Sequence, residues 1–408
     1  MNGSPIHQGN AMSPTRPSEF LNHMSIVKTR VPFSFSRTRR TKRGDFSKGF
    51  GLTVIALTLV LAAFSAVAAP QFKSVRQIDA AVRKEMAKQQ AVGVAVGLIK
   101  NNRIVYLKGY GYADREKRTR VDRNTMFRWA SISKCLTAVA ALQLREQKTL
   151  KLYLPVRTYV PEFPDKHPPI KTLQLLSHLG GIVHYSNGRV IRTEREYDTP
   201  HPYEDVILAL DTFKESPLVS RPGVRHSYSS HGFILASAVV QRAGKQKFAD
   251  QVNERIAKPA GMTTLQPDYQ WVDIPNRAAG YIKKDGKVVR DTDTDVSWKL
   301  GGGGFISNID DLALFATGLL SDTFMERRTR VLLWMPQRTN ARKPIEYALG
   351  FNVSGVGKDL KISHSGSQEK AKTRMVLYPN RGTGVVVMCN SRHVNPGDIT
   401  TALFPFVE

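Results

Sequence analysis

The sequence predicts a mixed α/β (α+β) fold, in which an antiparallel sheet built from both ends of the chain is flanked by helices. Three observations support this fold. Strand-like apolar runs lie early in the body of the chain, at 91–99 and 104–107, and such runs return from 349 onward. The region between them holds helix-type periodicity and loops rich in Pro and Gly. We therefore expect a mostly helical lobe, at about 135–345, inserted into the sheet domain, with a cleft between the two where pockets tend to form.

The first elements are a helix and a hairpin. Residues 71–90 favour a helix, and residues 91–99 form a β-type run rich in Val. The turn-type sequence at 100–103 and the apolar run at 104–107 complete the hairpin. A second helix begins near Ser131, because apolar residues then recur at three- and four-residue steps among strong helix formers.

The lobe and the closing strands follow. We expect Gly244 to end a buried helix at 233–243, and Asn308 and Asp310 to cap another helix. The glycine run at 301–304 allows another part of the chain to pass close to the backbone. The remaining expected elements are a short helix at 172–178, strands at 349–353, 360–363, 373–378 and 384–388, and a helix at 398–404.

The chain is basic throughout its length. Its formal net charge is +26 at pH 7. Residues 1–69 hold nine Lys and Arg against two Asp and Glu, so the remaining body carries +19. Because no Lys/Arg block is interleaved with aromatic residues, the sequence does not predict nucleic-acid binding. Attraction to anionic envelope polymers, anionic membrane surfaces or acidic substrates fits the charge better.

Residues 1–69 have the composition of a leader. A basic cluster at 37–48 precedes an uncharged, mostly apolar stretch at 51–69, which ends in an Ala-x-Ala pattern before Pro70. This pattern is typical of a secretory signal peptide, with Met24 as an alternative start. The rival interpretation is an uncleaved anchor in the inner membrane. Either interpretation places the domain at 70–408 outside the cytoplasm, in the periplasm or secreted.

The chain has two cysteines, Cys135 and Cys389. Both lie in apolar stretches that are expected to be buried, so we expect free thiols that pack as small hydrophobic groups. The sequence contains no His-Glu-x-x-His and no Cys-x-x-Cys, so it predicts neither a metal nor another cofactor.

A Ser-x-x-Lys sequence, Ser131–Lys134, stands at the start of the second helix. There the unpaired N–H groups of a helix start favour developing negative charge. The amine lies one turn on, on the same face as the hydroxyl, and an amine that loses its proton can activate a serine. The spacing also occurs at Ser25–Lys28 and Ser367–Lys370, so it is weak evidence alone, and a capping serine beside a solvated lysine remains the alternative.

Two further stretches supply candidates for a base and for substrate contacts. Tyr228-Ser229-Ser230 follows a Pro-Gly pair and directly precedes a buried helix, and cations near a tyrosine can lower its pKa. His364-Ser365-Gly366 ends a strand, where Gly lets a substrate approach and His donates a hydrogen bond. A core tyrosine and a polar turn are the alternatives. Tyr185-Ser186-Asn187 competes with the first stretch, but no helix follows it.

Taken in this order, the three stretches resemble the serine β-lactamase and penicillin-binding protein family, in its class C-like branch. Supporting similarities are Thr125-Met126-Phe127-Arg128, Leu175-Leu176-Ser177-His178 and Gly302-Gly303-Gly304-Phe305. Several other stretches, including Ala130–Lys134 and His184-Tyr185, are similar to the subfamily of mitochondrial serine β-lactamase-like proteins and their bacterial relatives. The resemblance implies a β-lactamase/transpeptidase-like fold.

The resemblance also implies roles for residues. Ser131 forms an acyl-enzyme, Lys134 helps to remove its proton, and Tyr228 passes that proton to the leaving group. The N–H groups of Ser131 and Ser367 form the oxyanion hole, while Ser230, His364 and Gly366 contact substrate. The implied enzyme is an exported serine hydrolase that acts on peptides, including cell-wall peptides. An esterase of small acyl esters, and a non-catalytic envelope protein that binds peptidoglycan or self-assembles, are the alternatives.

Two departures from the family pattern bear on the substrate. The family's Asn is replaced by Ser230, whose short hydroxyl offers less to a substrate amide, and this weakens the case for β-lactam turnover. The strand after Gly366 carries Lys370, Lys372 and Arg374 where the family has small or apolar residues. These charges either favour acidic substrates or form the solvent face of a strand.

Overall fold

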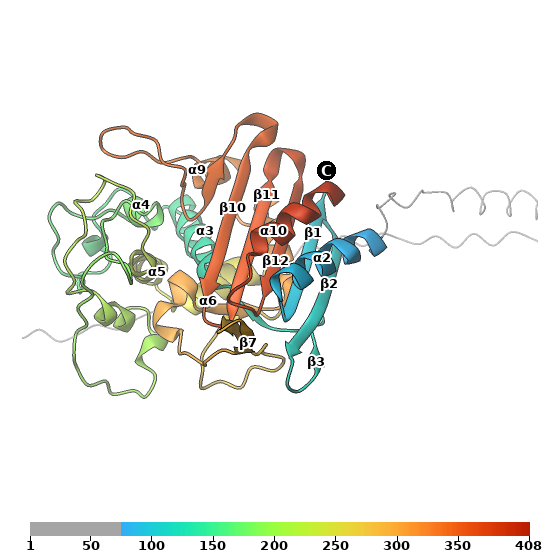
Figure 1. The fold of residues 1–408 in the computed structure, drawn as a ribbon. Helices are drawn as coiled ribbons and strands as arrows, with labels where there is room; N and C mark the ends of the chain where they lie inside the picture. Colours follow the sequence, from blue (N-terminus) through green and yellow to red (C-terminus); the bar gives the residue numbers. More distant parts are fainter. Residues whose placement is uncertain (1–74) are drawn as a thin grey trace, which may run out of the picture. The chain divides into compact units, whose positions relative to one another are not determined.

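The computed structural model describes residues 75–408. The predicted leader at 1–69 and its two interpretations lie outside the described residues. Within residues 75–408, a seven-stranded antiparallel sheet has helices on both faces, and a mostly helical region adjoins one side of the sheet (Figure 1). The strand order is β3-β2-β1-β12-β11-β10-β9. The bounds are β1 Gly93–Lys100, β2 Arg103–Asp114, β3 Thr119–Arg120, β9 Asn352–Ser354, β10 Lys361–Gln368, β11 Ala371–Tyr378 and β12 Thr383–Cys389.

Strands from the two ends of the chain meet at the centre of the sheet. In the β1–β12 pair, Val94 lies opposite Cys389 and Ile99 opposite Gly384. The predicted sheet of both termini is therefore confirmed. Strand β2 is longer than expected, because Gly109 and Gly111 continue it. A Cβ at Gly109 would lie 2.5 Å from the Val121 carbonyl oxygen, so glycine allows the close approach of the chain here and does not end the strand.

The two faces of the sheet bury different helices, as the alternation of side chains requires. On one face, α2 (Val75–Gln89) and α10 (Pro396–Leu403) cover Val94, Val96 and Leu98. On the other face, α3 (Ser133–Glu146) and α8 (Ile309–Leu320) belong to the core that contains Ala95 and Ile99. Both cysteines are buried free thiols, as expected.

The helical region packs α3 against two other helices, α5 (Ser230–Gly244) and α7 (Leu300–Gly303). The further helices of this region are α4 Thr172–Leu176, α6 Phe248–Val252 and α9 Arg327–Leu333. Two small sheets complete it, one of β4 Phe127–Arg128, β5 Gln266–Pro267 and β8 Phe305–Ser307, the other of β6 Tyr281–Lys284 and β7 Lys287–Arg290. Among the described residues, no helix is both long and apolar enough to cross a bilayer.

Several expected boundaries were wrong. Helix α5 starts at Ser230, three residues before the apolar run, because the Ser229 hydroxyl accepts the Gly232 N–H as an N-cap. The helix ends at Gly244 as expected, but the left-handed residue is the next one, Lys245, and Gly244 makes room for the Gln251 side chain. Asn308 caps α8 as expected, but Asp310 forms an ion pair with Arg123.

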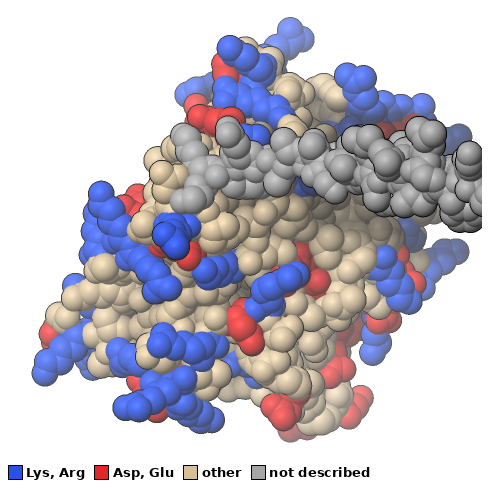
Figure 2. Space-filling model, turned by 90° about the vertical axis from the view of Figure 1, so that its right-hand side faces the viewer, with Lys and Arg blue, Asp and Glu red and all other residues tan. Residues whose placement is uncertain are grey.

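The basic residues are spread over the surface. Figure 2 shows Lys and Arg distributed over one face, with Asp and Glu between them and uncharged surface around them. On this face, Lys and Arg do not gather into one concentrated strip of positive charge.

Candidate active site

Ser131 and Lys134 lie at the junction of a one-turn 3₁₀-helix, Ala130–Ile132, and α3. Lys134 is fully buried, and its Nζ lies 3.1 Å from Ser131 Oγ. The same ammonium nitrogen is 3.0 Å from Ser230 Oγ and 2.6 Å from the carbonyl oxygen of Gly302. The predicted Ser131, Lys134 and Ser230 are thus brought together: the first two lie in adjoining elements, and Ser230 comes from the distant α5.

The surroundings of Lys134 favour its neutral form. Burial, and secondarily the positive charge of Lys299, lower the pKa of Lys134 to about 7. No carboxylate is among the three groups within hydrogen-bonding distance of Nζ. A neutral amine at this distance from a serine hydroxyl can accept the hydroxyl proton.

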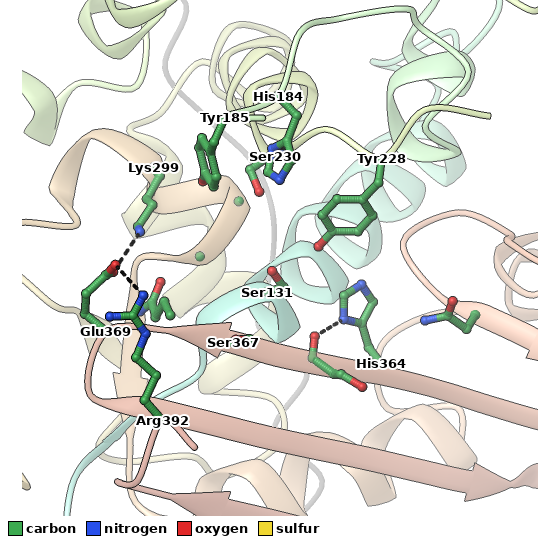
Figure 3. A pocket seen from close by; sticks show the side chains of 15 residues that line it. Ser131, His184, Tyr185, Tyr228, Ser230, Lys299, His364, Ser367, Glu369 and Arg392 are labelled. Carbon is green, nitrogen blue, oxygen red and sulfur yellow. Dashed lines mark hydrogen bonds and ion pairs between the residues drawn. The ribbon is translucent and has the colours of Figure 1, made fainter. Parts of the chain in front are cut away.

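Tyr228 lies across the cavity from α3 and faces Ser131 (Figure 3). Its ring centroid is 5.0 Å from Lys134 Nζ. The expectation that nearby lysines lower its pKa was wrong: burial raises the pKa of Tyr228 well above its usual value, and a hydrogen bond with Ser131 only partly opposes this. Tyr228 therefore keeps its proton at neutral pH, and can donate and relay a proton but not act as a tyrosinate base.

His178 holds the segment that carries Tyr228. Its carbonyl oxygen accepts the Ser227 N–H at 2.9 Å, and its Nδ1 accepts the Ser229 N–H at 3.1 Å. Its ring packs on the Tyr228 ring with centroids 4.2 Å apart. Burial and the charge of Lys134 keep the pKa of His178 well below its usual value, so Nδ1 stays available as an acceptor.

We expect His178→Leu to lower kcat by roughly 10- to 100-fold with little change in KM, because Tyr228 would lose its fixed position. His178→Asn, whose amide oxygen can replace Nδ1 as the acceptor, should retain more of the activity. Steady-state kinetics on a chromogenic ester measure both. The exposed His167, replaced by Asn, is the control. Equal losses for the Leu and Asn variants would contradict this role of the Nδ1 acceptor.

Strand β10 forms the wall of the site opposite the helices. Burial and the charge of Lys134 lower the pKa of His364 to about 3, so the imidazole is neutral. Its Nε2 is 3.0 Å from the Tyr347 hydroxyl, and its Nδ1 is 2.8 Å from the Ser365 carbonyl oxygen. Gly366 is required here, since a Cβ would lie 2.4 Å from the Trp129 carbonyl oxygen. Strand β10 can therefore lie directly against the turn that carries Ser131.

A cavity of about 490 Å³ connects these groups (Figure 3). Of the predicted residues, it is lined by Ser131, Tyr228, Ser230, His364 and Ser367. Lys134 lies buried beside it, and Gly366 lies in the strand that forms its wall. Sequence reasoning missed the contributions of Asn352, Lys299, Glu369 and Arg392, and it assigned no place in the site to His184 and Tyr185.

The stretch Tyr185–Asn187, which competed with Tyr228–Ser230 in the sequence, does not act as one unit. Tyr185 lines the cavity, but Asn187 bonds to the Ser227 hydroxyl and to the His184 N–H. His184 Nδ1 in turn accepts the Ser230 N–H at 3.2 Å. The adjacent pair His184-Tyr185 was the sequence signal for this part of the wall.

The basic residues after Gly366, which are Lys370, Lys372 and Arg374, are not among the residues that line the cavity. Lys370 pairs with Asp293, and Arg374 donates to the Ser365 hydroxyl. The cations that do line the cavity are Lys299 and Arg392. The described residues hold no cluster of His, Cys, Asp and Glu fit for a metal ion.

This fold and this site define a serine hydrolase class: residues 78–404 match the profile of the Beta-lactamase family, and the chain belongs to that family. The chain is 28% identical over 412 residues to the mitochondrial serine beta-lactamase-like protein LACTB of Mus musculus. The alignment covers 74% of this chain and 75% of that protein.

Two solved structures share the fold. One is the octameric penicillin-binding protein homologue from Pyrococcus abyssi, with a TM-score of 0.68, 21% identity, and coverage of 81% of this chain and 76% of that one. The other is EstCE1, a hydrolase with promiscuous acyltransferase activity, with a TM-score of 0.68, 19% identity, and coverage of 81% and 98%. Penicillin-binding proteins, amidases and esterases thus share this architecture.

Proposed function

We propose that the protein is an exported serine hydrolase that forms an acyl-enzyme on Ser131, with peptides as its substrates. The observation that carries this proposal is the buried Lys134 amine, 3.1 Å from Ser131 Oγ and with its pKa lowered to about 7. A solvated lysine beside a capping serine would be exposed and charged, so the alternative interpretation of the Ser-x-x-Lys pattern does not account for this burial.

The proposed reaction proceeds in two halves. Ser131 Oγ attacks the substrate carbonyl carbon while neutral Lys134 takes the hydroxyl proton. The N–H groups of Ser131 and Ser367 stabilise the oxyanion of the tetrahedral intermediate; each such donor contributes roughly 10² to 10³ in rate. Tyr228 relays the proton to the leaving amine or alcohol, which departs and leaves an ester on Ser131. Water then attacks this ester, its proton returns through the same groups, and the carboxylic acid product leaves.

The edge of β10 supports a peptide substrate. In the described chain, β9 pairs with β10 only at Lys361–Ser363, so the strand edge from Ser365 to Ser367 faces the cavity. An extended peptide can add to such an edge through backbone hydrogen bonds. Small acyl esters are the second candidate substrates, since the architecture is shared with the hydrolase EstCE1.

Labelling tests the nucleophile. A fluorophosphonate probe should modify the protein at Ser131, as read by peptide mass spectrometry, and Ser131→Ala should reduce labelling to background. Ser133→Ala is the matched control, because Ser133 is buried in the same turn. Undiminished labelling of Ser131→Ala would contradict the proposal. The proposed export is tested separately, by fusing residues 1–70 to a reporter that is active only outside the cytoplasm.

A further inference from the structure

Lys299 is a buried cation without a close anionic partner, and its ammonium lies 5.4 Å from the ring centroid of Trp298 and 6.0 Å from that of Tyr185. It is 8% exposed, and its ammonium makes no hydrogen bond to any described residue. The nearest carboxylate oxygen, Oε2 of Glu369, is 3.9 Å away. Burial lowers the pKa of Lys299, and the negative charge of Glu369 opposes this. A buried charge that is not closely paired retains much of its desolvation cost, so an additional anion in the cavity would be stabilised.

Arg392 faces the same carboxylate from the other side (Figure 3). It follows β12, and its backbone N–H donates to the Tyr281 carbonyl oxygen at 2.7 Å. Its guanidinium is 3.9 Å from Glu369 Oε1 and 4.0 Å from Asp291 Oδ1, without a hydrogen bond to either. The planar guanidinium can bind a carboxylate through two parallel hydrogen bonds, which neither contact provides at these distances.

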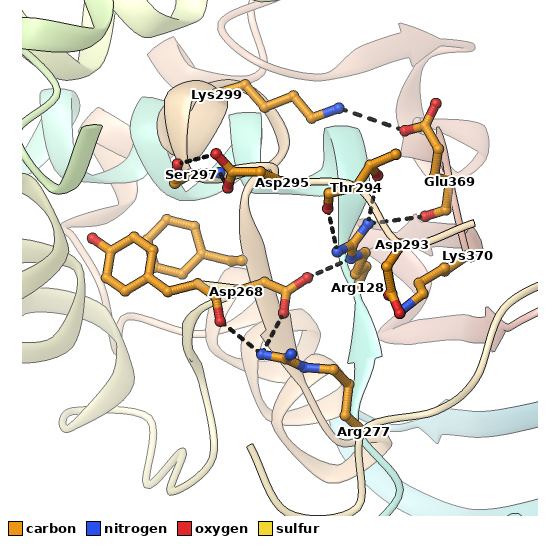
Figure 4. Close-up of polar contacts among 12 residues, drawn as sticks. Arg128, Asp268, Arg277, Asp293, Thr294, Asp295, Ser297, Lys299, Glu369 and Lys370 are labelled. Carbon is orange, nitrogen blue, oxygen red and sulfur yellow. Dashed lines mark hydrogen bonds and ion pairs between the residues drawn. The ribbon is translucent and has the colours of Figure 1, made fainter. Parts of the chain in front are cut away.

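Glu369 is fixed by its backbone but not by its carboxylate. Its carbonyl oxygen accepts from Arg128 at 3.4 Å (Figure 4). The next residue, Lys370, donates its N–H to Asp291 at 3.1 Å. Within residues 75–408, the carboxylate itself makes only the two long contacts with Lys299 and Arg392, and its side chain is 29% exposed. The side chain can therefore turn toward solvent while the β10–β11 turn stays in place.

The other charged and titratable groups near this position do not replace these two cations. His364 and His184 are neutral, because burial lowers the pKa of His364 to about 3 and of His184 to about 4. Asp295 is bound by the N–H and hydroxyl of Ser297, and Asp291 accepts the N–H groups of Thr292 and Lys370. Among the described residues, Lys299 and Arg392 are thus the cations that line the cavity, while the Lys134 amine beside it is held by Ser131, Ser230 and Gly302.

We propose that Lys299 and Arg392 form a receptor for a carboxylate of the substrate, and that Glu369 occupies this receptor until the substrate displaces it. The inference rests on the proposed function, and it assigns the enzyme to substrates whose acyl chain carries an anionic group, because Lys299 and Arg392 line the same cavity as Ser131. Glu369 then acts as an internal competitor. It weakens the binding of anionic substrates, which must displace it, and has little effect on the binding of substrates without an anionic group.

A pair of matched esters tests the receptor. Mono-p-nitrophenyl adipate and p-nitrophenyl hexanoate have acyl chains of equal length and differ in a terminal carboxylate or methyl group. We expect the ratio of their kcat/KM values to favour the adipate in the native chain. Lys299→Met and Arg392→Gln should each lower this ratio about tenfold, the scale of a lost charge-assisted hydrogen bond. Glu369→Gln should raise it several-fold, and Lys284→Met, on the exposed β6–β7 hairpin, should leave it unchanged.

A binding measurement separates this inference from the proposed catalysis. Calorimetry with Ser131→Ala follows the binding of monomethyl adipate without turnover. Binding that weakens in the Ser131→Ala/Lys299→Met variant supports the receptor, even if neither ester is hydrolysed by the native chain. The receptor would be overturned if Lys299→Met changed neither the ratio of the two kcat/KM values nor the binding constant of monomethyl adipate. Hydrolysis of the hexanoate would in that case still support Ser131 as the nucleophile. Equal losses on both esters would also overturn it, because they show general damage to the site.

Discussion

Lys134→Met should lower kcat/KM for p-nitrophenyl acetate by roughly 10³-fold or more, because it removes the group that accepts the Ser131 proton. Methionine fills a similar volume in the fully buried site, so the fold should be retained. The Ser131 and Ser230 hydroxyls would lose the amine that lies within 3.1 Å and 3.0 Å of them. Ester hydrolysis measured beside circular dichroism separates lost chemistry from lost structure.

The pH profile gives the same residue a second signature. Because burial lowers the pKa of Lys134 to about 7 and the neutral amine is the active form, kcat/KM should rise through about pH 7 and level off above it. His184 and His364, with pKa values lowered by burial to about 4 and about 3, lose their protons well below this range. Lys134→Arg stays protonated throughout and should show no such rise. A Lys134→Met variant within tenfold of the native rate would contradict a base role.

The chemistry of the site could be predicted where it depends on short sequence patterns. Ser131 and Lys134 are one helical turn apart, so their contact follows from local geometry, and Tyr228 was identified by the buried helix that follows it. The protonation state of Tyr228 could not be predicted, because it depends on how much water the folded surroundings exclude. Lys299 and Arg392 escaped notice for a related reason: they reach the cavity from separate segments, and neither stands in a pattern.

The fold was predictable at the level of strands and layers. Successive side chains of β1 and β12 point alternately into the two cores on opposite faces of the sheet, and both strands correspond to apolar runs that are visible in the sequence. The pairing of these two strands confirms the sheet of both termini. The extension of β2 through Gly109 and Gly111 was missed because glycine weakens a strand on propensity alone. Tertiary contact decides otherwise here: a Cβ at Gly111 would lie 2.0 Å from the Val92 carbonyl oxygen.

Asp268→Asn should lower the free energy of unfolding by about 3–5 kcal/mol, the usual cost of removing one partner of a buried ion pair. Asp268 is 1% exposed, and its carboxylate pairs with Arg128 and, at 3.0 Å, with Arg277 (Figure 4). The neutral amide keeps the shape of the side chain but leaves Arg128, itself 5% exposed, without its counter-charge. Urea denaturation followed by circular dichroism measures the loss.

The matched control for Asp268→Asn is Glu254→Gln, which breaks the exposed i,i+4 pair with Lys258 and should change the free energy of unfolding by less than about 1 kcal/mol. A loss below about 1 kcal/mol for Asp268→Asn would mean that Thr294, whose carbonyl oxygen accepts from Arg128 at 2.9 Å, compensates the charge sufficiently.

The expected loss has a consequence for the site. Arg128 precedes Ser131 by three residues and also binds the Glu369 backbone, so the ion pair ties the nucleophile's turn to the segment that carries the internal carboxylate. Asp268→Asn should therefore narrow the preference for adipate over hexanoate at temperatures where the protein remains folded.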